Sequence, residues 1–316
     1  MNIVKKAYKM AYNTAYKTGI INSEYYIRTT HEMAALNITD YKAMKRHGYD
    51  CSDFQGLMHT EDRLFNASEE EFVKLLTDER RLANDAGITF SQVHAPWPTD
   101  DRTEESRAQR LDHMKKAVRG TVLLGSENLV VHPLMPDWGH EDEPDWVEQI
   151  NEEFLRQICP YAADYGVNIC LENMPMTALR LSRMNKIVEM VERLKADLPN
   201  LFICMDTGHC NLYGDDCGDM VRLCGERLKV LHIHDNSGCR DDHHFPYCGT
   251  INWESFSRAL RETGFDGVLS LETAVLCRYP EGRSEKGTSD NEARKAACAD
   301  ARETMAQGLA KLVKTI

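Results

Sequence analysis

The sequence predicts an α/β fold, a (β/α)8 barrel formed by a single domain over residues 1–316. Apolar, β-branched-rich runs of five to seven residues alternate with longer segments whose apolar positions follow helical spacing. The strand-like runs are apolar on both faces, which is typical of a parallel sheet covered by helices. Eight such units, with no long linker or low-complexity break between them, fit a barrel better than a doubly wound open sheet.

In chain order, two weaker strand candidates come first and six clear ones follow. The predicted strands cover residues 17–23, 48–54, 88–94, 128–132, 167–172, 201–206, 228–234 and 267–272. Amphipathic helices are predicted between them, for example where Phe72, Leu76 and Ala83 recur at helical spacing. A last helix is predicted at about 290–316, and its apolar face is interpreted as core or as a subunit contact in a homo-oligomer.

The composition is that of a globular protein and excludes several other classes. The chain is 42% hydrophobic and 28% charged, and it contains no run of about 18 apolar residues that could cross a membrane. Lysines and tyrosines interrupt the first residues, where a signal peptide would be apolar, so a cytoplasmic location is predicted. Eleven cysteines without a CxxC pair predict reduced, mostly buried thiols.

Charge and missing motifs limit the range of partners. The formal net charge of −12 repels a phosphate backbone at long range, which argues against nucleic acid as the main partner. The glycine-rich GxGxxG and GxxxxGK[ST] loops that hold nucleotide phosphates are absent from the sequence. A small molecule is therefore the expected partner.

Six successive predicted strands end in a side chain that can bind a metal ion. These residues are His94, His132, Glu172, Asp206, His234 and Glu272. In a barrel the carboxyl ends of all strands open onto one face, so residues far apart in the sequence converge on a single mouth. Six such residues in phase are hard to explain by composition, and they predict a functional site there.

The stretch from 230 to 249 adds further candidates, because it contains four histidines and three aspartates. Of these, His232 is expected to be a buried, hydrogen-bonded core residue. Asp241 and His243 are expected to be solvated loop residues. Trp97, which follows the strand ending at His94, is a candidate for stacking against a sugar at the mouth.

Several short motifs in this order resemble the xylose-isomerase-like TIM-barrel superfamily. They are HAPW (94–97), VHP (131–133), LEN (171–173), MDTGH (205–209), HIHD (232–235) and LET (271–273). The resemblance covers roughly residues 48–275. That superfamily contains sugar and sugar-phosphate isomerases and epimerases, inosose dehydratases, and the endonuclease IV type of AP endonuclease.

The resemblance implies roles for individual residues. Four of them match the ligands of one divalent metal ion in the isomerases and epimerases: Glu172, Asp206, His234 and Glu272. Glu172 and Glu272 also match the carboxylates that exchange a substrate proton. His209 and Arg240 match residues that bind substrate. The other residues expected on the substrate side are His94, His132, His244 and Trp97.

Physical chemistry agrees with these roles. Three carboxylates and one imidazole form a hard site that suits Mn²⁺, Mg²⁺ or Co²⁺ and also accepts Zn²⁺. The metal stabilises an enediolate as a Lewis acid, while the two glutamates remove and return the proton. We therefore expect a divalent-metal-dependent isomerase or epimerase of a small carbohydrate or sugar phosphate. An inosose dehydratase or a C-glycoside-cleaving lyase would use the same site.

Two hypotheses of other classes remain open. The endonuclease IV type holds three zinc ions on a wider ligand set, for which this chain offers His94, His132, His209, Asp242 and His244 as additional ligands. Such a cluster would make the protein a phosphodiesterase, but the acidic net charge and the short loop after His234 favour a single ion. A barrel that has lost catalysis and only binds a ligand is the other hypothesis, and the intact Glu172 and Glu272 argue against it.

Overall fold

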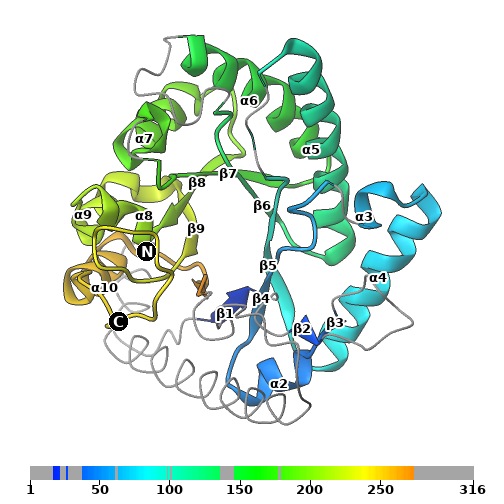
Figure 1. Cartoon of the computed structure of the whole chain (residues 1–316), viewed down its shortest axis with the longest axis horizontal. Coiled ribbons are helices and arrows are strands. Elements are labelled where there is room, and N and C mark those ends of the chain that lie inside the picture. The colour runs from blue at the N-terminus through cyan, green and yellow to red at the C-terminus, as the bar shows by residue number, and fades with distance from the viewer. Residues whose placement is uncertain are drawn as a thin grey trace, which may run out of the picture.

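In the computed structural model, eight parallel strands form a ring and the helices lie outside it (Figure 1). The structure describes residues 17–21, 26–27, 38–60, 63–97, 99, 102–135, 146–176 and 179–273. The strands, in chain order, are β1 (Thr18–Ile21), β4 (Cys51–Phe54), β5 (Thr89–His94), β6 (Asn128–Val131), β7 (Asn168–Glu172), β8 (Leu201–Asp206), β9 (Leu228–His232) and β10 (Leu269–Leu271). Each of the eight predicted strands is therefore confirmed.

The sheet closes on itself, which makes it a barrel. β10 pairs with β1 in parallel register, and the other end of the sheet is β9. Just beyond β9, the Ile233 N–H donates to the Ser270 carbonyl at 2.8 Å, and the Glu272 N–H donates to the Ile233 carbonyl at 3.0 Å. These bonds join β9 to β10, and the predicted (β/α)8 TIM barrel is confirmed.

Helices follow the strands around the outside of the ring (Figure 1). They are α2 (Tyr41–Arg46), α3 (Arg63–Asn66), α4 (Glu69–Asp85), α5 (Glu104–Leu124), α6 (Trp146–Asp164), α7 (Met184–Leu194), α8 (Thr207–Leu212), α9 (Cys217–Cys224) and α10 (Trp253–Thr263). Two short strands, β2 (Tyr26–Ile27) and β3 (Ile38–Thr39), form a separate antiparallel pair that the sequence did not predict. The helix predicted at 290–316 lies outside the described residues.

Local sequence sets the ends of the helices and the faces they bury. The Ser68 side chain accepts a hydrogen bond from the Glu71 N–H and caps α4, while Gly125 ends α5 with a φ of 78°. Along α4, Phe72 and Leu76 are fully buried against the barrel, as their spacing predicts. Burying each of these side chains contributes about 1.5–3 kcal/mol to folding.

A small apolar cluster inside the barrel forms the floor of the site. It consists of Val130, Cys170, Cys204 and Val230, one from each of β6 to β9. Side chains two residues apart on a strand share a face, so the residues two positions further along point into the barrel above this floor. Those residues are His132, Glu172, Asp206 and His232.

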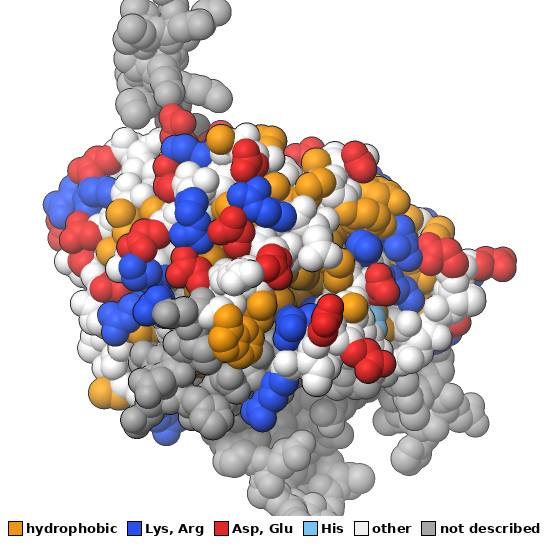
Figure 2. All heavy atoms as spheres, turned by 90° about the horizontal axis from the view of Figure 1, so that it is seen from above, with side chains coloured by type: hydrophobic (Ala, Val, Ile, Leu, Met, Phe, Trp, Pro, Cys, Tyr) orange, Lys and Arg blue, Asp and Glu red, His pale blue; other side chains and the backbone are white. Residues whose placement is uncertain are grey.

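The outer surface carries charges of both signs. Figure 2 shows acidic and basic side chains interspersed over the face turned to the viewer, without a large field of one sign. Many of them form exposed ion pairs, such as Arg156 with Asp197 at 3.0 Å. Among the described residues, no helix is long and apolar enough to span a membrane. Most of the described cysteines are buried, as predicted.

The loop between β9 and α10 is organised by the buried carboxylate of Asp235. Its oxygens accept hydrogen bonds from the backbone N–H groups of Asn236, Tyr247 and Ile251 at 2.9–3.3 Å. They also accept one from the Trp253 indole at 2.9 Å. One side chain therefore determines the path of the loop that borders the mouth of the barrel.

We predict that Asp235→Asn lowers the free energy of unfolding by about 2–4 kcal/mol, because an amide replaces one acceptor oxygen and leaves buried donors unpaired. Chemical denaturation measures the change. The matched control is Asp197→Asn, which removes an exposed ion pair and should cost at most about 1 kcal/mol. Equal, small losses in the two variants would contradict the role given to Asp235.

Candidate metal centre

Four side chains meet at the carboxyl ends of β7 to β10, and we call them the inner group. They are Glu172, Asp206, His232 and Glu272, and each places one ligand atom within 4.8 Å of the others. His232 Nδ1 lies 2.7 Å from Glu172 Oε1 and 2.9 Å from Glu272 Oε2. Glu272 is the most accessible member, with 13% of its side chain exposed, whereas the other three are almost completely buried.

The histidine of this group differs from the one that the sequence analysis selected. The prediction placed His234 with the three carboxylates. The structure places His232 among them, while His234 Nε2 lies 2.8 Å from Asp206 Oδ2 at the edge of the group. The reason is the strand register, because β8 and β9 pair Asp206 with His232 directly. His232 was expected to be a buried, hydrogen-bonded residue, which it is, but its hydrogen bonds go to the site itself.

The inner group fits a divalent cation. Burial raises the pKa of Glu172, but His232, His132 and His94 outweigh this effect and hold that pKa well below its usual range. Burial also raises the pKa of Glu272, but His232 outweighs this effect and lowers that pKa. Within the described part of the chain, Glu172 Oε2 is buried and forms no hydrogen bond of regular geometry, although two imidazole nitrogens lie near it. Three carboxylates and one imidazole are a donor set that suits a hard divalent ion.

Two further histidines lie against the buried Glu172. The Nε2 atoms of His94 and His132 are 3.6 Å and 3.1 Å from Glu172 Oε2. His94 Nδ1 carries its proton, because it lies 2.8 Å from the carbonyl of Ala95, which can only accept. The Trp97 ring packs edge-to-face against His132, with ring centroids 5.3 Å apart. The structure therefore brings these three predicted substrate-side residues to the inner group.

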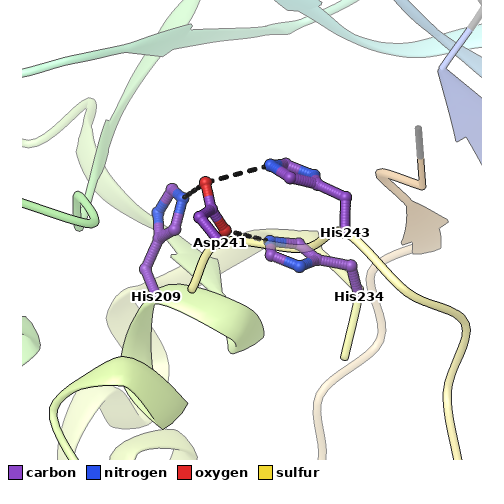
Figure 3. A group of neighbouring side chains, drawn as sticks. All are labelled: His209, His234, Asp241 and His243. Atoms are coloured by element: carbon purple, nitrogen blue, oxygen red, sulfur yellow. Dashed lines mark hydrogen bonds and ion pairs between the residues drawn. The ribbon is translucent and has the colours of Figure 1, made fainter. Parts of the chain in front are cut away.

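A second cluster, which we call the outer group, lies beside the first (Figure 3). It consists of His209, His234, Asp241 and His243, and their ligand atoms also lie within 4.8 Å of one another. Asp241 Oδ2 is 3.4 Å from His209 Nε2 and 3.1 Å from His243 Nε2, while its Oδ1 is 3.8 Å from His234 Nε2. His209, predicted to bind substrate, is therefore at the mouth.

Two of the three imidazoles of the outer group are held in a fixed orientation by backbone carbonyls. His209 Nδ1 donates to the Asn173 carbonyl and His243 Nδ1 donates to the Glu272 carbonyl, each at 2.7 Å. Both Nε2 atoms are thereby turned toward Asp241. Burial lowers the pKa of His209, but Asp206 and Asp241 outweigh it and raise that pKa to about 10. The outer group therefore holds a proton when no other cation occupies it.

The outer group contains Asp241 and His243 in place of the predicted Asp242 and His244. The backbone of His244 pairs with Asp235 through hydrogen bonds of 2.7 Å and 2.8 Å, which fixes the loop register. His243 has a φ of 49°, and its side chain points to the site while that of His244 is 39% exposed. The correction is thus a shift of one residue.

Arg240, predicted to bind substrate, is not part of either group. Its side chain is 83% exposed, and its Nη2 atom lies 3.1 Å from Asp242 Oδ1. The Arg240–Asp242 pair lies on the loop surface.

Two residues that support the site were not predicted. The Asn173 side chain donates to the Asp206 carbonyl at 3.1 Å and accepts from the Asp206 N–H at 2.8 Å. Gly208 is the second, because a Cβ atom there would lie 1.9 Å from His234 Cε1. Both residues lie within the quoted motifs LEN and MDTGH, and their positions beside Glu172 and His209 were the available signal.

Most of the chain matches a known protein family. A family model described as xylose isomerase-like TIM barrel matches residues 41–312. The chain belongs to this family. Similar curated proteins include an uncharacterised protein of Methanocaldococcus jannaschii, 33% identical over 191 residues. That match covers 57% of this chain and 63% of the archaeal protein.

Other relatives of this family member have named activities. A D-psicose 3-epimerase of Ruminiclostridium cellulolyticum is 26% identical over 209 residues, which cover 63% of this chain and 68% of that enzyme. An inosose isomerase of Bacillus velezensis is 21% identical over 241 residues, which cover 74% of this chain and 81% of that protein.

Solved structures show the same fold. A D-psicose 3-epimerase crystallised in the presence of D-fructose superposes with a TM-score of 0.70 at 18% identity, covering 94% of this chain and 99% of that one. The IOLI protein with a binding zinc atom gives a TM-score of 0.69 at 20% identity, covering 94% and 98% of the two chains. At these identities the likeness establishes the barrel alone.

The two neighbouring histidines of HIHD should differ in their effect on metal binding. We predict that His232→Ala weakens binding of Mn²⁺ to chelator-treated protein by at least about 100-fold, because it removes a ligand atom. His234→Ala, the comparison variant, removes a side chain whose Nε2 lies 2.8 Å from the ligand atom of Asp206, so it should weaken binding less, by about tenfold. Competition with a fluorescent chelator measures both constants. A larger loss in His234→Ala would restore the ligand set predicted from sequence.

Proposed function

We propose that this protein is a divalent-metal-dependent isomerase or epimerase that acts on a small carbohydrate or sugar phosphate. The observation that carries the proposal is the convergence of two glutamates, Glu172 and Glu272, on one side of His232 at the barrel mouth. Relatives of the chain are named as sugar epimerases and inosose isomerases, which supports an enzyme that acts on sugars.

The inner group would hold the cation through Glu172, Asp206, His232 and Glu272. Its chemistry admits Mn²⁺, Mg²⁺, Co²⁺ or Zn²⁺. When bound, the ion supplies Lewis-acid stabilisation of negative charge on neighbouring substrate oxygens. The relative solved with a binding zinc atom supports a divalent metal.

The protein's own residues supply the proton transfers. One glutamate removes the proton from the carbon next to the substrate carbonyl, and the other returns a proton to the adjacent position or opposite face. Glu272, with 13% of its side chain exposed, is the more accessible carboxylate, and Gln55 lies 3.5 Å from its Oε1 atom. His94, His132, Trp97 and His209 would contact sugar hydroxyls or a phosphate, which the packing of Trp97 on His132 and of His209 on His234 beside the glutamates supports.

We expect Glu272→Gln to suppress exchange of a carbon-bound substrate hydrogen with heavy water by about 100-fold or more, the usual effect of losing a general base. Because Glu272 is also a proposed ligand, metal content is measured on the same sample. Glu262→Gln is the matched control, since Glu262 forms an exposed pair with Arg222. Full exchange by metal-loaded Glu272→Gln would refute the role of Glu272.

The same site would also serve an inosose dehydratase or a C-glycoside-cleaving lyase, because each begins with loss of a proton next to a carbonyl. A panel of ketoses, inososes and their phosphates, assayed with Mn²⁺, separates these activities. The proposal names the isomerase or epimerase first because the curated relatives with named activities are of that class.

One observation favours a second candidate, a phosphodiesterase with three zinc ions. Glu172 belongs to the inner group and also forms a ligand-type group with His94 and His132, and the outer group adjoins the inner one where His234 Nε2 lies 2.8 Å from Asp206 Oδ2. Three adjoining groups could hold three ions, as the endonuclease IV resemblance implies. The net charge of −12 and the mixed charges of the surface weigh against binding to DNA.

Counting ions separates the two candidates. We predict about one tightly held divalent ion per chain after purification without chelator and dialysis against metal-free buffer, because one ion suffices to hold two neighbouring sugar oxygens. Elemental analysis measures the ratio. Three zinc ions per chain, together with cleavage of abasic DNA, would overturn the isomerase proposal in favour of the nuclease.

A further inference from the structure

His232 uses both of its ring nitrogens, and only one of them faces the inner group. Nδ1 points to Glu172 and Glu272, whereas Nε2 lies 3.0 Å from Oδ2 of Asp53. Asp53 is in β4, 179 residues earlier in the chain, and it is completely buried. The same Oδ2 atom accepts a hydrogen bond of 3.1 Å from the buried side chain of Gln92.

This contact decides which nitrogen of His232 can bind a cation. Oδ2 of Asp53 already accepts the hydrogen bond from Gln92 and acts as the acceptor of this contact too, so Nε2 carries the proton. In the neutral ring the lone pair is then on Nδ1, directed between the two glutamates. Ligand histidines of metal sites commonly donate their other N–H to a carboxylate, which fixes the ring and makes the ligand more basic.

The backbone of β4 is shaped to make the contact. The pairing of β4 with β5 shifts register between Ser52 and Asp53, an irregularity of the bulge type. Bulges change the direction of a side chain and are common next to functional sites. Ser52 and Asp53 are both fully buried, and the shift accompanies the placement of Asp53 against His232 across the barrel interior.

Stability alone does not account for this carboxylate. Asp53 has one other oxygen, Oδ1, which is buried and has no hydrogen-bond partner among the described residues. A buried carboxylate with an unsatisfied oxygen costs free energy that its contacts with His232 and Gln92 do not fully return. We propose that Asp53 is a positioning residue that holds the His232 ring with Nδ1 free for the divalent ion, and that Gln92 holds Asp53 in turn.

This inference rests on the inner ligand set of the proposed function, and it is tested by metal binding instead of sugar turnover. Asp53→Asn keeps an acceptor oxygen but loses the charge, and Asp53→Ala removes both. We expect the Mn²⁺ dissociation constant of chelator-treated protein to rise about tenfold in the first variant and up to about 100-fold in the second. Asp50→Asn, three residues away and paired with Lys45 on the surface, is the matched control and should bind Mn²⁺ like the unaltered protein.

A spectroscopic signal tests the tautomer directly. In zinc-loaded protein, the Nε2 proton of His232 should give a downfield proton resonance that is retained in Asp50→Asn and lost in Asp53→Ala. Thermal unfolding of the metal-free variants shows whether each is folded. If Asp53→Ala does not fold, the isosteric Asp53→Asn decides the outcome.

The outcomes distinguish the inference from the proposed function. Folded Asp53 variants that bind Mn²⁺ as tightly as the unaltered protein would overturn the role of Asp53 and leave the isomerase proposal intact. Mn²⁺ affinities that fall in the Asp53 variants as expected, together with no turnover of any sugar by the unaltered protein, would overturn the isomerase proposal alone. An unaltered protein that binds no divalent ion would overturn both.

Discussion

The buried carboxylate of Glu172 is the constraint on which the rest of the site depends. Only 1% of this residue is exposed, and a carboxylate so far from water costs several kcal/mol unless it is paired. His94, His132 and His232 surround it, and each comes from, or directly follows, a different strand. Removing any one of these imidazoles changes how strongly the other two interact with Glu172. The effects of their mutations on stability will therefore not add.

The closed barrel makes this burial feasible. Below the site, Cys170 and Cys204 belong to an apolar layer inside the ring, and Glu172 and Asp206 stand two residues further along the same strands. This layer keeps water away from the carboxylates on one side. Electrostatic interactions are stronger in such surroundings than in water, which explains why the neighbouring imidazoles hold the pKa of Glu172 so low.

The sequence was sufficient to predict the barrel and most of the residues at its mouth, because both follow from the repeat of strand and helix. It could not decide between His232 and His234. Their relation to Asp206 depends on a register shift between β8 and β9 at Ile203 and Cys204, which is a property of backbone pairing. The shift from His244 to His243 has a similar origin in the pairing of the loop with Asp235. Asp53 was missed because nothing in its own segment indicates a partner 179 residues away.

The inner and outer groups offer different ligand atoms, mostly carboxylate oxygens in the first and mostly imidazole nitrogens in the second. Which metal ion is present therefore affects how many ions can bind. Three carboxylates and one imidazole favour hard ions such as Mg²⁺ or Mn²⁺, whereas three imidazoles and one carboxylate favour Zn²⁺. A hard ion in the inner group would leave the imidazoles of His209 and His243 unliganded. If zinc were abundant, a zinc ion bound in the outer group would occupy these same imidazoles. Against the effect of burial, Asp206 and Asp241 raise the pKa of His209 to about 10, and Asp241 and Glu272 raise the pKa of His243 to about 9. An ion in the outer group would therefore have to displace tightly held protons.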